Sequence, residues 1–534
     1  MVLVAAPLVG WPRVVRLPAV ILPALLLALV VLRPSAGGKS VLAAPGWQPS
    51  RRAVWTGAGL VALLLFWYVV TRFRSGEINA IDFTVYYDRP CFQTVHGRPL
   101  LVETSDTPAL SGRTELADHA YWGMLLVCAP YALVPSPLWL HALSAIAIAA
   151  GAVHVLRILQ RLGASGALAV ASASAFLLND NTARTLNYGF HPEVLYAWFV
   201  PWMLDAGLRG ARRSFLVAML ACILVKEDAC FPLFAAAVGL ALNRWSAMTR
   251  EDRVVFAFLP VAIGLANLAV YYLWVVPMLT GQDRPAYSHF WGNYGATPAA
   301  AAIGMLTHPW SVLVAAMTSG IFRVLQPHLF LPVVGWRWSL GLIPIVMLYG
   351  ASANHQVRAF GIYYAIVLVP FLVIAASVGA AALARRFFKS ETHAQLAAAG
   401  VVLAGALLVG SGSRGYSLRP WRPEVAAVPA ALERLGGEPV VLVQSGLFPH
   451  AGYDERFKLL TPETVHDAGS AGAAVLLAHH IGAYPYHRRE LAALFELPAI
   501  AGMPEGLLAV RIDRPLPTPV EAPKARRSQR RRPR

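Results

Sequence analysis

The sequence predicts a mainly α protein, a polytopic transmembrane helical bundle with a small C-terminal α/β domain outside the membrane. The first observation is composition: 57% of the 534 residues are hydrophobic and only 14% are charged, whereas soluble domains carry about 25% charged residues. The second is the recurrence of apolar runs near bilayer-spanning length through the first three quarters of the chain. The third is a change in composition near residue 411, after which shorter apolar segments appear.

The formal net charge is +17, and much of the excess lies between apolar runs and in the arginine-rich tail 526–534. Excess Lys and Arg in short loops is what the positive-inside rule predicts for membrane proteins. We therefore predict membrane lipids as partners and no nucleic acid.

The N-terminal segment 1–52 contains an apolar run, 17–32, that follows Arg13 and Arg16 and precedes Arg33. It resembles a signal sequence but shows no clear small-residue cleavage site. We expect a retained extra span, with a removed signal peptide as the alternative.

Residues 53–410 are expected to form the transmembrane domain, with about eleven spans, or twelve with the N-terminal one. The expected spans are 53–70, 138–156, 166–178, 194–208, 215–225, 229–242, 254–276, 321–334, 340–350, 360–383 and 394–409. Segment 71–119 is too long and polar for a turn and is expected to be a structured outer loop. Segment 120–134 should lie at the outer interface or enter the membrane partly, and 299–318 should be amphipathic.

Residues 411–513 are expected to form the small α/β domain on the extracytoplasmic side, and 514–534 a disordered basic tail. Segments 440–443, 473–477 and 507–512 have the composition of short buried strands, and 425–435 and 488–495 that of amphipathic helices.

The four cysteines are Cys91, Cys128, Cys222 and Cys230. They show neither a Cys-x-x-Cys pair nor metal-ligand spacing. We expect the chain not to be a disulfide scaffold, and three of the cysteines to pack as small hydrophobic residues.

Three consecutive charges, Lys226-Glu227-Asp228, interrupt a long apolar tract. A charge in hydrocarbon costs free energy or draws water, so such residues suggest a functional site. The positive-inside pattern places this triplet on the outer side together with Asp82, His119, His191, Glu193 and His355. The structural alternative is a simple turn between two helices that ends in water.

Each candidate residue has a chemical and a structural interpretation. Asp82, near the membrane surface, could be a general base toward a hydroxyl, or an ordinary loop aspartate or helix cap. His191 could bind a phosphate or a metal with Glu193 orienting it, but Pro192 and Glu193 also suit a helix start. Lys226 could pair with a lipid-linked phosphate. Glu227 and Asp228 could position that lysine, bind a metal or contact sugar hydroxyls.

Several motifs resemble a bacterial "predicted membrane protein" family, a domain of unknown function related to the GT-C glycosyltransferases. The resemblance covers residues 53–512. The motifs are Phe190-His191-Pro192-Glu193, Lys226-Glu227-Asp228, His96-Gly97-Arg98-Pro99, His119 before Pro135-Ser136-Pro137, Tyr363-Tyr364 to Pro370-Phe371, and Phe448-Pro449-His450 with Arg456.

The resemblance implies a GT-C-like enzyme of the bacterial plasma membrane that transfers a sugar from a polyprenyl-phosphate donor to an extracytoplasmic, cell-envelope acceptor. By position Asp82 is the catalytic base, although the sequence after it departs from the family pattern and leaves Asp88 as an alternative. The substrate-binding set is His119, His191, Glu193, Lys226, Glu227, Asp228 and His355; a divalent metal is an open requirement. The alternatives are a transporter or flippase of a lipid-linked precursor and a non-catalytic membrane subunit.

Overall fold

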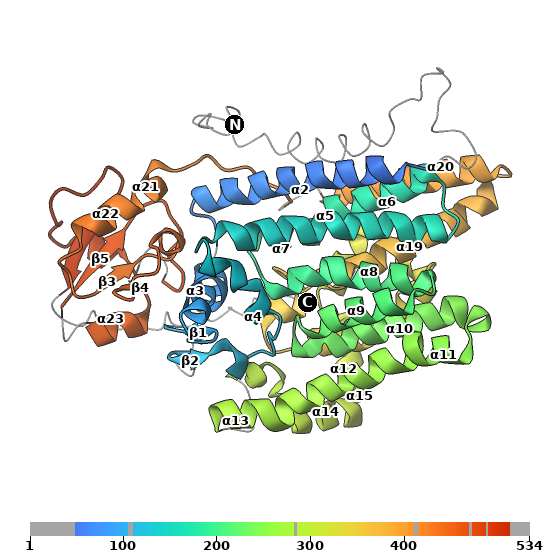
Figure 1. The fold of residues 1–534 in the computed structure, drawn as a ribbon, viewed down its shortest axis with the longest axis horizontal. Helices are drawn as coiled ribbons and strands as arrows, with labels where there is room; N and C mark the ends of the chain where they lie inside the picture. Colours follow the sequence, from blue (N-terminus) through green and yellow to red (C-terminus); the bar gives the residue numbers. More distant parts are fainter. Residues whose placement is uncertain are drawn as a thin grey trace, which may run out of the picture.

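A computed structural model describes residues 48–512, apart from 79, 105–109, 282–285, 411–414, 469–471 and 487–489. The expected N-terminal span and the basic tail lie outside the described residues. Most of the described chain forms a helical bundle, and residues 423–512 form a compact α/β domain at one end of it (Figure 1). We call this the domain end and the other the basic end.

The bundle is built from long and short helices. They are α2 (Arg51–Arg74), α5 (Leu138–Arg161), α6 (Gly166–Leu178), α7 (Asp180–Tyr188), α8 (Tyr196–Leu208), α9 (Arg212–Ile223), α10 (Cys230–Arg244), α11 (Arg250–Arg253), α12 (Leu259–Val270), α13 (Val276–Thr280), α14 (Pro298–Thr307), α15 (Pro309–Met317), α16 (Ile321–Leu325), α17 (Ile343–Gly350), α18 (His355–Arg358), α19 (Val369–Phe387) and α20 (Glu391–Gly410). Helix α5 lies at the centre and packs against α2, α6 and α8.

Four described helical segments are long and apolar enough to cross a membrane: 51–74, 138–161, 250–280 and 369–387. The pair α14 and α15 is bent by 92° and would count as a fifth if it is one span. Most of the other expected crossings coincide with shorter helices, as in α8, α9 and α10, and the expected span 394–409 lies within α20. The total of eleven or twelve spans therefore stays a prediction.

Local sequence explains where several helices begin. The side chains of Ser50 and Ser165 accept hydrogen bonds from backbone N–H groups in the first turns of α2 and α6. Thr249 and Asp252 form a reciprocal capping box at α11. Pro370 stands in the first turn of α19, where its missing N–H costs no helical bond.

The expected helix over 360–383 begins only at Val369. Phe360 and Ile362 have positive φ angles, +49° and +44°, which bulky L residues adopt only at a cost in conformational energy. The expected interfacial segment 120–134 is also broken, into α4 (Met124–Val127) and a 3₁₀ turn, Ala129–Ala132, that contains Pro130. Leu126 of α4 is exposed, as an interfacial segment requires.

The predicted outer loop contains a π-helical segment, Ile81–Asp88, then α3 (Arg89–Val95), a two-stranded ribbon of β1 (Leu101–Val102) and β2 (Arg113–Thr114), and a 3₁₀ turn, Glu115–Ala117. The C-terminal domain contains a four-stranded sheet ordered β4-β3-β5-β6. Its strands are β3 (Val441–Val443), β4 (Phe457–Leu459), β5 (Ala473–Leu477) and β6 (Leu508–Ile512). β3 pairs in parallel with β4 and β5, and β5 pairs antiparallel with β6.

The three expected strands coincide with β3, β5 and β6, whereas β4 was not predicted. Helices α21 (Pro423–Ala426), α22 (Val428–Arg434), α23 (Pro462–Ala468) and α24 (Ala492–Phe495) complete the domain. Strand β5 is buried along its whole length, as expected of a central strand.

The expectation that three of the four cysteines pack as small hydrophobic residues holds for two of them, because the other two are bonded to each other. Cys91 of α3 and Cys128, just after α4, form a disulfide with a Cα–Cα distance of 4.7 Å. Their separation of 37 residues matches no local cysteine motif, so only the fold brings them together. Cys222 and Cys230 are free and buried, as predicted for small hydrophobic residues.

The C-terminal domain is held against the outer-loop segment by polar contacts. The Arg89 guanidinium donates to the carbonyl oxygens of Gly452 and Asp454, both at 2.9 Å. Asp88 accepts hydrogen bonds from Tyr131 at 2.7 Å and from Tyr453 at 2.9 Å. The domain is therefore attached directly to the π-helical segment that carries Asp82.

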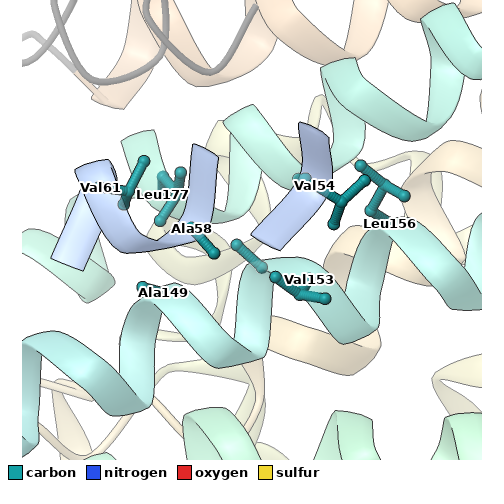
Figure 2. Close-up of a pocket in the computed structure, with 9 residues that line it drawn as sticks. Val54, Ala58, Val61, Ala149, Val153, Leu156 and Leu177 are labelled. Atoms are coloured by element: carbon teal, nitrogen blue, oxygen red, sulfur yellow. The ribbon is translucent and has the colours of Figure 1, made fainter. Parts of the chain in front are cut away.

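A small apolar pocket lies between α2, α5 and α6, within the bundle (Figure 2). It is lined by Val54, Ala58, Val61, Ala149, Ala152, Val153, Leu156, Ala173 and Leu177. None of these side chains can bind a proton, a phosphate or a metal, so the chemistry must be sought elsewhere.

Candidate functional site

Two short interruptions between helices position the charged motifs. His191 has an extended backbone and precedes a 3₁₀ turn, Pro192–Leu195, which leads into α8. Lys226 is also extended and precedes a second 3₁₀ turn, Glu227–Ala229, which leads into α10. Because α8 packs against α10, the two interruptions place their side chains on one side of the helix pair.

Lys226 and Glu193 form the central ion pair of the cluster. Lys226 Nζ lies 2.7 Å from Glu193 Oε1, and only 8% and 6% of the two side chains is exposed. Glu193 Oε2 lies 3.2 Å from His191 Nδ1. His191 Nε2 is buried and has no hydrogen-bond partner among the described residues. The sequence motifs thus meet directly, although they stand more than thirty residues apart.

Glu227 and Asp228 point to different partners. Glu227 Oε1 lies 3.0 Å from His119 Nδ1, and Glu227 Oε2 accepts a hydrogen bond from the Ala120 N–H at 3.0 Å. Asp228 accepts hydrogen bonds from Tyr196 at 2.9 Å and from Tyr349 at 3.0 Å. Glu227 therefore joins the outer-loop segment to the bundle. Asp228 is instead held by hydroxyl groups and forms no ion pair with a cationic side chain of the described residues.

Asp82 reaches the cluster through a tyrosine. It accepts a short hydrogen bond from the Tyr188 hydroxyl, and the Tyr188 ring lies 5.7 Å from that of His191, centroid to centroid. Unlike Lys226 and Glu193, Asp82 is half-buried. Asp228 is half-buried as well, and a base that must meet an acceptor hydroxyl has to be at least partly accessible.

Tyrosines form most of the wall around these charges, and sequence reasoning missed most of them. The Tyr87 hydroxyl lies 3.0 Å from His191 Nδ1 and 3.2 Å from the Tyr121 hydroxyl. The Tyr363 ring stacks on the His191 ring at a centroid distance of 3.5 Å. Lys226 Nζ lies 5.7 Å from the centroid of the Tyr121 ring. Only the Tyr363-Tyr364 dipeptide gave a sequence signal.

Glu115 adds a carboxylate that was not among the predicted site residues. It is buried, and its Oε2 has no hydrogen-bond partner among the described residues. Burial, together with the nearby charge of Asp118, raises the pKa of Glu115 well above its usual value. The cluster therefore contains more carboxylates than cationic side chains.

His355 lies apart from the cluster described so far. It is exposed at the start of α18, and the contacts above do not include it. Its predicted role in substrate binding stays a prediction. Within the described residues, three or more His, Cys, Asp or Glu side chains nowhere gather in a way that could hold a metal ion. The metal requirement also stays open.

The family described as "Predicted membrane protein (DUF2079)" matches residues 77–414. The chain belongs to this family. The match includes both charged motifs and the turns that carry them, and it confirms the sequence resemblance and the membrane assignment.

Two solved structures are similar to the chain, both of ArnT from Cupriavidus metallidurans. The form bound to undecaprenyl phosphate gives 12% identity and a TM-score of 0.45, with 86% of this chain and 98% of that chain covered. The apo form gives 12% identity, a TM-score of 0.44 and the same coverage. The search of curated protein sequences found no match.

Proposed function

We propose that this membrane protein is a GT-C-type glycosyltransferase that moves a sugar from a polyprenyl-phosphate donor to an extracytoplasmic acceptor. The observation that carries the proposal is the gathering of Asp82, His191, Glu193, Lys226 and Asp228 at the domain end, within one tyrosine-rich wall. Side chains that share hydrogen bonds and ring contacts can act on one substrate.

The proposed reaction is an inverting displacement. The Asp82 carboxylate accepts the proton of the acceptor hydroxyl, whose oxygen forms a bond to the anomeric carbon of the sugar. The bond from that carbon to the carrier phosphate breaks, and the phosphate leaves with the electron pair. The ammonium group of Lys226 has three donors and uses one on Glu193, so its remaining donors can stabilise the departing phosphate.

Charge and disulfide chemistry both support an outward-facing site in the bacterial plasma membrane. Arginines mark the basic end, at the start of α2 and the ends of α5 and α10, as the positive-inside rule predicts for cytoplasmic ends. The Cys91–Cys128 disulfide lies toward the other end, and disulfides persist mainly in oxidising compartments. We therefore propose that the domain end lies outside the cell.

The deciding experiment uses the full chain in lipid nanodiscs with polyprenyl-phosphate sugars, labelled in the sugar, and membrane extracts as acceptor. Wild type should transfer label to the extract. Asp82→Asn should lower transfer at least a hundredfold, because removal of a general base typically costs 10²–10⁴ in rate.

Asp88→Asn is the matched control, because Asp88 lies in the same helical segment but faces Tyr131 and Tyr453. Equal transfer by wild type and Asp82→Asn would remove Asp82 as the base. Movement of intact labelled lipid between leaflets, with no sugar released from the carrier, would support a flippase instead.

A further inference from the structure

A group of exposed basic side chains, Arg323, His355 and Arg358, lies where two turns of the chain meet. We call it the basic rim. Arg323 Nη2 donates to the carbonyl oxygen of Ala359 at 2.7 Å. Arg358 Nη2 donates to the Thr318 hydroxyl at 3.1 Å. The rim is therefore a defined arrangement, in which each arginine side chain is anchored to the opposite turn.

No acidic residue occurs between residues 284 and 390. Accordingly, Arg358 forms no ion pair with any described residue. The charges of the rim therefore sit in a long stretch of sequence without carboxylates. An anion supplied from outside the protein would complement them, and a guanidinium group suits a phosphate because it can donate two parallel hydrogen bonds.

Apolar side chains next to the rim are exposed. Met317 ends α15 and is 52% exposed, and Phe322, next to Arg323, is 48% exposed. In a membrane protein, such side chains contact acyl or isoprenoid chains, while neighbouring arginines reach the headgroup level. A lipid phosphate is thus the anion that this position would meet.

The rim is connected to the charged cluster by a short, strained loop. Five residues after Arg358, the Tyr363 ring stacks on His191. Between them Phe360 and Ile362 hold positive φ angles, a conformation that bulky residues keep only where the surroundings impose it. An anion bound at Arg358 would therefore act close to the residue that covers His191.

We propose that the basic rim binds the phosphate of a membrane lipid whose chain lies along Met317 and Phe322. In terms of the proposed function, on which this assignment rests, that lipid is the polyprenyl-phosphate donor as it approaches the cluster. The rim also gives His355, three residues before Arg358 on α18, a place in substrate binding.

The test measures binding rather than transfer. Full-length protein in phosphatidylcholine nanodiscs is titrated with radiolabelled polyprenyl monophosphate. Arg358→Gln should bind about tenfold more weakly, as expected for the loss of a charge-assisted hydrogen bond, and Arg323→Gln should weaken binding as well. Arg358→Lys should restore part of the affinity, which excludes a mere folding defect.

Arg337→Gln is the matched control, because Arg337 is an exposed arginine of the same carboxylate-free stretch that lies beside Trp336. It should bind as wild type does. Equal binding by Arg358→Gln, Arg323→Gln and wild type, or equal binding of unphosphorylated polyprenol, would overturn the proposal.

Two further measurements distinguish a failure of this binding proposal from a failure of the proposed transfer reaction. Asp82→Asn should bind polyprenyl phosphate normally whether or not it transfers sugar, so a failed transfer assay leaves the binding result intact. If phosphatidylglycerol at equal concentration displaces the labelled polyprenyl phosphate, the rim binds lipid phosphates in general. That result would overturn its assignment to the carrier lipid.

Discussion

Two buried charged clusters lie at opposite ends of α8, and they balance their charges differently. Near the end of the helix, Asp205 is bound by Arg161 at 2.6 Å, His154 at 3.3 Å and Arg209 at 3.6 Å. One carboxylate there meets three basic side chains. The second cluster lies just before the start of α8. Among its described residues, Glu193 and Lys226 form the only pair between a carboxylate and a lysine or arginine.

On the proposed function, this difference distinguishes a structural cluster at Asp205 from a chemical one at Glu193 and Lys226. The Asp205 carboxylate is saturated by partners that also suit the C-terminal end of a helix. At the other end, Asp228 is held by tyrosines, Glu115 keeps an oxygen without a described partner, and His191 keeps a ring nitrogen without one. Such incompletely satisfied groups cost stability and are retained where a ligand uses them.

The largest effect is expected from Lys226→Met, which would break the central pair. A buried Glu193 without its cation should lower the free energy of unfolding by about 3–5 kcal/mol and abolish transfer. Thermal unfolding in detergent micelles measures the first effect and the labelled-sugar assay the second.

The matched variant is the double substitution Lys226→Met with Glu193→Gln. It should recover most of the stability, since no charge is left unpaired, but no transfer. Recovery of transfer would show that the pair is structural, like the Asp205 cluster.

A smaller effect is expected from pH, through Asp88 at the domain end. Burial raises the pKa of Asp88 from 3.8 to about 6. Between these values the folded protein binds more protons than the unfolded one, so stability should fall as pH rises from 4 to 6. A shift of two pKa units corresponds to about 3 kcal/mol at most.

Asp88→Asn should remove this dependence, and the measurement is the unfolding midpoint of both proteins at several pH values. Parallel pH profiles would contradict the assignment. Substitution of Asp205, in the other cluster, should leave the dependence of the unfolding midpoint on pH unchanged.

The smallest effect is expected from Asp205→Asn. Arg161 and Arg209 are about one third exposed, so water can solvate them once the charge is removed, and the loss should be about 1–2 kcal/mol. Transfer per folded molecule should equal that of wild type. A transfer rate reduced tenfold or more at equal folding would show that the two clusters are coupled.

The sequence predicted the charged motifs more completely than it predicted their surroundings. Lys226 and Glu193 were expected on one side of the membrane because charges in apolar tracts are rare and the arginine pattern assigns sides. Their direct pairing could not be predicted, because it depends on how α8 packs against α10. Tyr196 and Tyr349, which hold Asp228, looked like ordinary aromatic residues within apolar runs.

Segment length and hydropathy predicted the elements that are buried along their whole length. They did not predict where an unusual backbone conformation delays the start of a helix. Strand β5 is apolar throughout and was expected. The start of α19 was misplaced, because no sequence rule anticipates positive φ angles at Phe360 and Ile362. Segment 180–188 is polar in sequence, yet it forms α7, whose polar Asn181 and Thr185 are buried.

The Cys91–Cys128 bond encloses the segment that carries His119 and Tyr121, which touch Glu227 and reach Glu193. The order of maturation follows from this. Both thiols must reach an oxidising compartment before the bond forms, and only then is the segment between them closed into a covalent loop. On the proposed function and orientation, the newly made chain would gain transfer activity only after this end has been exported.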